Sequence, residues 1–161
     1  MKIVRPKLSQ HPDEYINRKL FHSINVQTVC DSDCFFLEVV VAWPGSVHDS
    51  RIFKNSSLFH RLARGQINGI LLGDNGYAIS PFLLTPYLQP TNDVQVNYNA
   101  RHKTTRNVIE RTFGQLKKPF HCLGSILRLR LHRVCPVIIA CFILHNLAKR
   151  YNDPNFDIDC K

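Results

Sequence analysis

The sequence predicts one α/β domain in which a mixed sheet is covered by helices. In the first half of the chain, short segments have the apolar alternation or the continuous apolar runs typical of strands. In the second half, apolar residues recur at helical spacing. The predicted order is strand, strand, helix, strand, helix, helix, an order that indicates helices packed on a mixed sheet. The length of 161 residues suffices for one domain with its own core.

The first two strands should form a hairpin. Residues 23–30 alternate between apolar and polar side chains, which predicts a strand with one buried face. Residues 31–33, Asp-Ser-Asp, are typical of a turn. Residues 34–43 are almost continuously apolar, so we expect a second strand that is buried on both faces.

A helix and a short strand are predicted next. Pro44 and Gly45 end the second strand, and Ser46 with Asp49 fits a capping box at the start of a helix. The helix should end near Gly65, where glycine allows the left-handed backbone that often terminates helices. Residues 70–72 then predict a short apolar strand.

The last third of the chain predicts two helices. Residues 80–101 contain three prolines and should form a long connection, with a short strand near 94–98. A helix should begin at Thr104 or Thr105 and run to about residue 118, where Pro119 stops it. A final helix at about 136–151 is apolar around most of its circumference and should lie in the core. The residues expected to be buried there are Val137, Ile138, Ile139, Cys141, Phe142 and Leu144.

Composition indicates the class of partner. The formal net charge of +9 favours a polyanion, with nucleic acid ahead of a membrane, although the charge could also be spread for solubility. The N-terminus lacks the apolar segment of a secretory signal, and the apolar run 137–144 is too short to span a bilayer. The six cysteines form no CxxC pair, so we expect reduced thiols in the nucleus or cytosol.

Two carboxylates are candidates for chemistry. Asp74 follows the short strand and precedes Asn75-Gly76, a position where it could hold a metal ion or satisfy turn amides. Glu110 lies within a predicted helix with Arg106 four residues before it, which by itself indicates an exposed helical ion pair. If the two carboxylates converge, they supply the hard oxygen ligands that Mg²⁺ or Mn²⁺ needs for phosphoryl chemistry.

Several sequence segments resemble those of PIF/Harbinger transposases and their domesticated nuclease-like relatives. The resemblance begins at YINRK and covers nearly the whole chain. The segments follow one another in the family's order: PGSVHDSRIFKNSSL, LLGDNGY, LLTPY, YNARHKTTRNVIERTFGQLKKPF and IIACFILHN.

The resemblance implies a ribonuclease H-like fold and a DDE set of carboxylates that binds a divalent cation, Mg²⁺ or Mn²⁺. It also implies hydrolysis or transfer of DNA strands, a nuclear or cytoplasmic location, a Myb-like protein partner and no membrane. By position, Asp74 would be the second catalytic aspartate and Glu110 the catalytic glutamate. Asp49 would be an auxiliary metal ligand, unless it serves only the capping box.

The sequence departs from the family pattern at its beginning. In the family, the first catalytic aspartate lies in a D-x-T-H strand a few positions before a segment like KIVRP, and here Met1 directly precedes that segment. We therefore expect the first strand to be largely missing and catalysis to be impaired. The expected parts are a basic arm or strand remnant at 1–19, a nuclease-like domain at 20–152 and a tail at 153–161. The alternative is a non-catalytic remnant that binds DNA or a protein.

Basic residues surround Glu110 in the sequence. They are expected to contact DNA phosphates without sequence preference, or else to form a solvated helix face. The set comprises Arg101, Lys103, Arg106, Arg111, Lys117 and Lys118.

Overall fold

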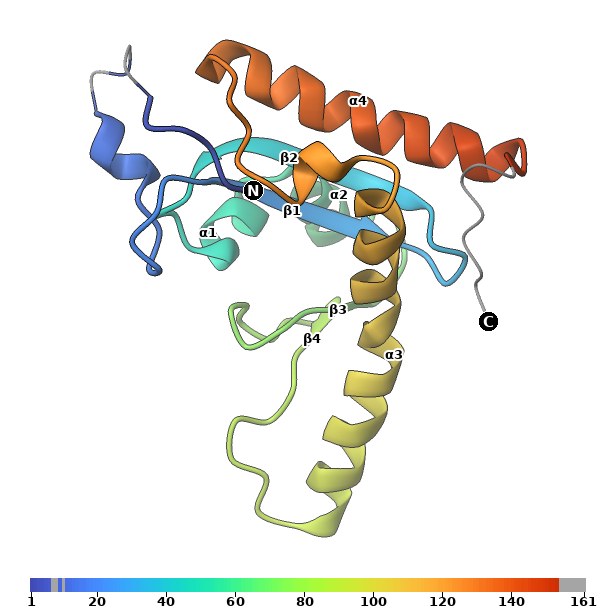
Figure 1. Cartoon of the computed structure of the whole chain (residues 1–161). Coiled ribbons are helices and arrows are strands. Elements are labelled where there is room, and N and C mark those ends of the chain that lie inside the picture. Colours follow the sequence, from blue (N-terminus) through green and yellow to red (C-terminus); the bar gives the residue numbers. More distant parts are fainter. Residues whose placement is uncertain (7–8, 10, 154–161) are drawn as a thin grey trace. The chain divides into compact units, whose positions relative to one another are not determined.

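The computed structural model describes residues 1–6, 9 and 11–153, which form a mixed arrangement of helices and small sheets (Figure 1). The described chain divides into two compact units, His48–Glu110 and the remainder, Met1–Val47 with the segment that begins at Arg111. The division falls inside the long helix α3 (Asp93–Lys117). Most of the predicted tail at 153–161 lies outside the described residues.

The predicted hairpin is confirmed in the first unit. Strand β1 (Ile24–Cys30) pairs with strand β2 (Phe36–Pro44) in antiparallel orientation. In the turn between them, one carboxylate oxygen of Asp31 accepts hydrogen bonds from the Asp33 and Phe35 amides, at 3.0 and 2.9 Å. Burial of β2 on both faces was wrong, because within the strand only Phe36 is buried and Leu37 is 66% exposed.

The first residues of the chain are paired on both sides. The Ile24 amide donates to the Met1 carbonyl, and the Ile3 amide donates to the His22 carbonyl. On the other side, the Val4 amide donates to the Leu127 carbonyl, and the Leu127 amide donates to the Lys2 carbonyl. The segment 2–4 therefore lies between the start of β1 and residue 127. A 3₁₀ helix, η1 (Pro12–Tyr15), follows.

The last helix, α4 (Leu131–Arg150), begins five residues earlier than predicted and continues through Pro136. Its buried side contributes Phe142 to an aromatic cluster. The centroid of the Phe36 ring lies 4.4 Å from that of Phe142 and 5.9 Å from that of Phe113. Within this unit, a short 3₁₀ helix, η2 (His121–Leu123), precedes α4.

The prediction that α4 is wholly core was only partly right. Ile138, Cys141 and Phe142 are buried and Val137 is half-buried, but Ile139 and Leu144 are 40% and 48% exposed. A single hairpin and the elements beside it cover one side of a helix, whereas an apolar stripe that runs around the helix needs partners on both sides. By length and composition alone α4 could cross a membrane, a test that core helices of soluble proteins also pass.

The second unit begins with two short helices instead of the one predicted. Helix α1 (Asp49–Lys54) has His48 at its N-cap without a side-chain hydrogen bond, so the predicted capping box was wrong. Helix α2 (Ser57–Ala63) is capped by the Ser56 hydroxyl, which accepts from the Phe59 amide at 3.1 Å. Gly65 has a φ of +66° and ends this segment as predicted.

The strands of the second unit are short. Strand β3 (Leu71–Leu72) was predicted, and it pairs in parallel with strand β4 (Leu83–Leu84), which was not. Phe53, Leu62 and Leu83 form the core of this unit. In the described part of the chain the four strands form two separate two-stranded sheets, whereas one mixed sheet was expected.

Helix α3 (Asp93–Lys117) begins about eleven residues before its predicted start. The strand predicted near 94–98 was therefore wrong. The Asn92 carboxamide oxygen accepts from the Gln95 amide at 2.9 Å and caps the helix, and the last proline before it is Pro90. The helix ends at Lys117, as the position of Pro119 predicted.

Candidate active site

Asp74 lies in the turn that follows β3. The Gly73 amide donates to the Leu84 carbonyl at 2.9 Å, so the chain remains paired with β4 up to the residue before Asp74. One carboxylate oxygen of Asp74 accepts from the Gly76 amide at 2.9 Å. The other oxygen faces a cation, Arg106. The two interpretations of this residue are thus compatible, because one oxygen serves the turn and the second is directed toward charge.

Helix α3 is fixed beside β4 by polar contacts. The buried His102 ring places Nε2 3.2 Å from the Leu84 carbonyl oxygen, and the Tyr98 hydroxyl donates to the Thr85 carbonyl at 3.1 Å. One turn away, the Asn99 side chain makes two hydrogen bonds to the Tyr87 backbone, at 2.8 and 2.9 Å. These contacts set the position of the next turns of α3. Sequence reasoning missed them because it treated residues 80–101 as a connection.

Arg106 joins the two predicted catalytic carboxylates. Its guanidinium nitrogens lie 3.6 Å from Asp74 Oδ2 and 3.6 Å from Glu110 Oε1. The side chain of Arg106 is 29% exposed, against 48% for Asp74 and 67% for Glu110. The carboxylates therefore share one cation near the surface, which explains how an ordinary helical ion pair and an acidic pair coexist at this place.

Asp49 and Asp74 converge on Gly76. A Cβ atom built on Gly76 would lie 3.0 Å from Asp74 Oδ1 and 3.5 Å from Asp49 Oδ2, so both carboxylates face the same small space. Burial raises the pKa of Tyr77, and the negative charges of Asp49 and Asp74 raise it further. Tyr77 is thus a protonated phenol beside the acids, and no spacing rule in the sequence singled it out.

The carboxylates of Asp49, Asp74 and Glu110 were predicted to be metal ligands. Among the described residues, no group of three or more His, Cys, Asp or Glu side chains is arranged to hold a metal ion. The roles of Asp49, Asp74 and Glu110 as metal ligands, and of Asp74 and Glu110 in catalysis, stay predictions.

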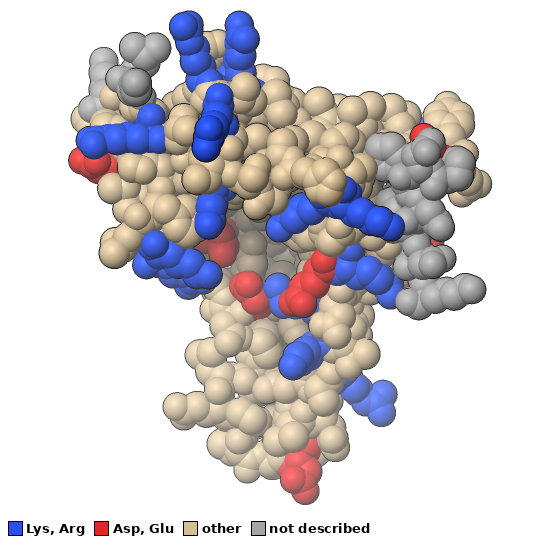
Figure 2. Space-filling model, viewed as in Figure 1, with Lys and Arg blue, Asp and Glu red and all other residues tan. Residues whose placement is uncertain are grey.

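The predicted DNA-contacting residues divide between the two units. Lys103, Arg106 and Glu110 follow one another at spacings of three and four residues along α3, so the two basic residues share one helix face with the carboxylate. Arg101 is exposed on the same helix, in a different direction. The remaining three, Arg111, Lys117 and Lys118, belong to the first unit and are exposed. Figure 2 shows basic side chains in several groups over the visible surface, interrupted by acidic ones.

Comparisons with known proteins identify the family. Residues 1–146 match the family described as DDE superfamily endonuclease. "Putative nuclease HARBI1" of Mus musculus is 37% identical over 138 residues, and the Homo sapiens protein of that name is 36% identical over the same length. Each alignment covers 83% of this chain and 40% of the relative.

A plant relative has the same extent. "Protein ALP1-like" of Arabidopsis thaliana is 30% identical over 154 residues, which is 84% of this chain and 37% of the relative. The chain thus spans about 40% of the length of the curated relatives it matches. No solved structure matches the chain. With the family match over residues 1–146 and the similarity to these relatives, the chain belongs to the DDE superfamily endonucleases, among the Harbinger transposase-derived nucleases.

Proposed function

We propose that this chain is the metal- and DNA-binding part of a transposase-derived nuclease that acts on phosphodiester bonds of nuclear DNA. The observation that carries the proposal is the sharing of one cation, the Arg106 guanidinium, by Asp74 and Glu110. By resemblance, these two positions would hold the family's second aspartate and its glutamate.

The residues present fit Mg²⁺ or Mn²⁺. Both ions prefer oxygen ligands, and Mg²⁺ is often bound by one or two protein carboxylates together with water and phosphate. Asp74 and Glu110 would hold the ion, with Asp49 as an auxiliary ligand on the Gly76 side. When bound, the ion activates a water molecule and neutralises charge that develops on the phosphate.

Arg106 has two roles in this proposal. Without a metal ion, its guanidinium offsets the repulsion between the carboxylates. With one bound, the displaced guanidinium would contact a DNA phosphate, for which its planar set of donors is suited. Lys103 on the same helix face would add a second phosphate contact, and Arg101, Arg111, Lys117 and Lys118 would contribute affinity that depends on salt.

We further propose a ribonuclease H-like arrangement with weak catalysis by these 161 residues. The antiparallel hairpin, and the pairing of residues 2–4 beside the start of β1, are consistent with the end of a first strand at that position. Two carboxylates bind one ion at most, and loss of the electrostatic partner of a second ion costs several kcal/mol of barrier. The rate should therefore be roughly hundreds-fold below that of a form with a full carboxylate set.

Metal binding by Asp74 and Glu110 can be tested without catalysis. Electron paramagnetic resonance of Mn²⁺ would be titrated with the 161-residue chain and with Asp74→Asn, Glu110→Gln and the control Asp93→Asn. Asp93 is an exposed acid at the start of α3 and makes a matched control. We expect Mn²⁺ affinity to fall roughly tenfold or more in the first two variants, because one of two ligands is lost. Affinity unchanged in Asp74→Asn would remove the proposed site.

A nicking assay on supercoiled DNA with Mg²⁺ or Mn²⁺ tests the second part of the proposal. We expect little cleavage by the 161 residues and faster cleavage by a form extended upstream through a D-x-T-H strand. Rapid cleavage by the 161 residues that disappears in Asp74→Asn would show that another acid completes the set.

A second candidate function is non-catalytic binding to DNA or to a protein such as a Myb-like partner. It is favoured by the observation that no three-residue metal-ligand group exists within the described residues. This candidate predicts salt-dependent DNA binding that is equal in the presence of Mn²⁺ and of a chelator. The metal-dependent nuclease predicts tighter DNA binding when Mn²⁺ is present.

A further inference from the structure

The solvent side of α4 is apolar along most of its length. No Asp, Glu, Lys or Arg occurs in residues 134–148, which form about four helical turns. Ile139, Ile143 and Leu147, at i, i+4 and i+8, are 40%, 55% and 42% exposed. Figure 2 shows a continuous uncharged surface along α4, with basic side chains at its N-terminal end. Contiguous exposed apolar surface of this kind marks interaction sites.

The apolar surface continues from α4 onto β2. A hollow of about 140 Å³ lies between the two elements, and an apolar cavity of about 150 Å³ is large enough for a benzene-sized group. The hollow would thus accept one large apolar side chain. Its lining is mostly apolar and includes Leu37, Ile139, Phe142 and Ile143, together with the polar residues Glu38 and Asn146.

The edge of β2 beside the hollow is not open to an added strand at Phe36. The Asn146 side-chain amide accepts from the Phe36 N–H at 3.0 Å and donates to the Phe36 carbonyl at 2.8 Å. These are the two backbone groups that an added strand would use. The occupant that fits is therefore a helix that inserts side chains, and exposed Ala140 leaves room on α4 for close approach of such a helix.

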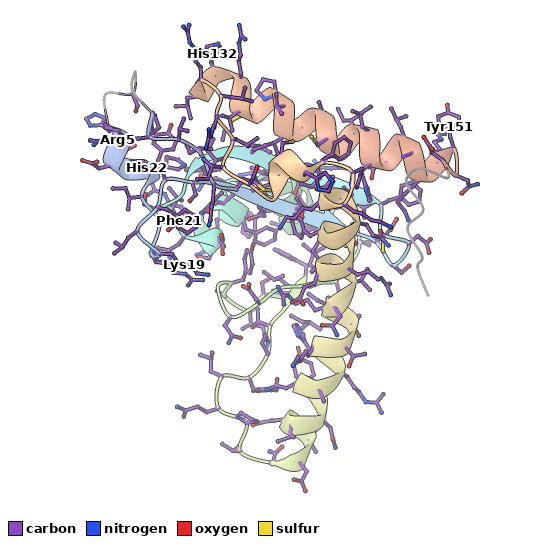
Figure 3. All side chains as sticks on the ribbon, viewed as in Figure 1. Arg5, Lys19, Phe21, His22, His132 and Tyr151 are labelled. Atoms are coloured by element: carbon purple, nitrogen blue, oxygen red, sulfur yellow. The ribbon has the colours of Figure 1, made fainter. Side chains whose placement is uncertain are left out.

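Charge at the two ends of α4 selects among possible occupants. Arg130 and Arg133 lie exposed at its beginning, and Lys149 and Arg150 lie at its end. Figure 3 marks these ends by His132 and Tyr151. A second copy of α4 would bring like charges together at both ends, whether it packed parallel or antiparallel. A helix with acidic residues at both ends and an apolar middle would meet opposite charges instead.

We propose that the α4–β2 surface, defined by the exposed side chains among residues 136–147 of α4 and the hollow beside Leu37, binds one amphipathic helix of a partner protein, acidic at both ends. The partner's apolar face covers Ile139, Ile143 and Leu147, and one large side chain fills the hollow. This interaction is independent of the proposed metal site, whose residues belong to the other unit.

The test uses the 161-residue chain and two fluorescent helical peptides, each about six turns long. Both peptides carry the same leucine stripe; one has glutamates at both ends and the other has lysines. Anisotropy titrations should give at least roughly tenfold tighter binding of the glutamate-ended peptide, since several charge pairs change sign. The double variant Arg133→Glu/Arg150→Glu should reverse this preference. Equal binding of both peptides would refute the proposal.

Variants in the middle of α4 locate the binding surface. Ile143→Glu and Ala140→Glu should each weaken binding of the glutamate-ended peptide roughly tenfold or more, because a charge is buried in the apolar contact. Val94→Glu, at a position on α3 that is 77% exposed, is the matched control and should bind normally. Should Ile143→Glu melt early by circular dichroism, Ala140→Glu decides, since Ala140 is exposed and contributes little to the core.

Two other occupants have their own signatures. Sedimentation velocity that shows a dimer of the wild-type chain, dissociated by Ala140→Glu, would assign the surface to a second copy and overturn the proposal. Co-sedimentation with phosphatidylcholine–phosphatidylserine vesicles, abolished by Ala140→Glu, would assign it to a membrane and would likewise overturn it.

Discussion

The two long helices of this protein differ in the chemical character of their surfaces. Helix α3 carries charged residues along its length and is fixed beside β4 by hydrogen bonds from His102, Tyr98 and Asn99. Helix α4 has no charged residue in 134–148 and buries apolar residues such as Phe142, and Asn146 adds two hydrogen bonds to the Phe36 backbone. Polar contacts are directional and orient side chains, whereas apolar packing mainly supplies stability. We accordingly propose chemistry on α3, and stability and partner binding on α4.

The largest effect should come from the buried side of α4. Phe142→Ala should lower the free energy of unfolding by about 3–5 kcal/mol, because it removes a ring that packs on Phe36 and Phe113. Ile143→Ala, one residue away and 55% exposed, should cost less than about 1 kcal/mol. Urea denaturation followed by circular dichroism measures both. Equal costs would mean that both sides of α4 are buried.

The polar attachment of α3 should be worth less. His102→Ala should cost about 1 kcal/mol, because the buried imidazole loses its hydrogen bond to the Leu84 carbonyl, which keeps its bond from the Gly73 amide. Amide hydrogen exchange should become faster in residues 83–87 and should change little elsewhere. Thr104→Ala, on the exposed side of α3, is the control and should leave exchange in this segment unaltered. Exchange unchanged in His102→Ala would show that packing alone holds α3 in place.

A methyl group at Gly76 should displace the carboxylates of Asp49 and Asp74 directly. In Gly76→Ala the new Cβ would lie 3.0 Å from Asp74 Oδ1, so the carboxylate must shift. Mn²⁺ affinity, measured by paramagnetic resonance, should fall roughly three- to tenfold. Gly69→Ala has no atom within 4 Å of its new Cβ and should bind Mn²⁺ as the wild type does. Equal affinities would place the ion away from Asp49 and Asp74.

Removal of the Arg106 charge should act in the opposite direction. Arg106→Gln should tighten Mn²⁺ binding roughly two- to fivefold, because partly exposed ion pairs of this kind are worth about 1 kcal/mol or less. DNA affinity should fall in the same variant. Arg101→Gln removes an equal charge from the same helix without contact to the carboxylates, and it should leave Mn²⁺ affinity near the wild-type value. Weaker Mn²⁺ binding in Arg106→Gln would contradict the proposal that the guanidinium occupies the ion's position when no metal is bound.

The smallest effect concerns DNA affinity. Lys103→Gln should reduce the slope of log affinity against log salt by about one unit and weaken binding to all duplex sequences alike. Fluorescence anisotropy at several salt concentrations measures the slope. A loss restricted to one DNA sequence would indicate base recognition by α3 instead of phosphate contact.

Local chemistry in the sequence was sufficient for several elements. The alternation in 23–30 predicted β1, and Gly65 and Pro119 marked where helices end. These predictions succeeded because strand periodicity, left-handed glycine and the missing amide of proline act within a few residues of the chain.

Tertiary structure decided what those local rules left open. The Asn92 cap is a local signal for the early start of α3, but contacts with Leu84, Thr85 and Tyr87 hold the helix in place. The single cation shared by Asp74 and Glu110 and the convergence of Asp49 on Gly76 depend on a strand, a turn and two helices that meet only in the folded unit. Which side of α4 is buried was likewise undetermined, because an apolar residue records a preference for burial and not the identity of the surface that covers it.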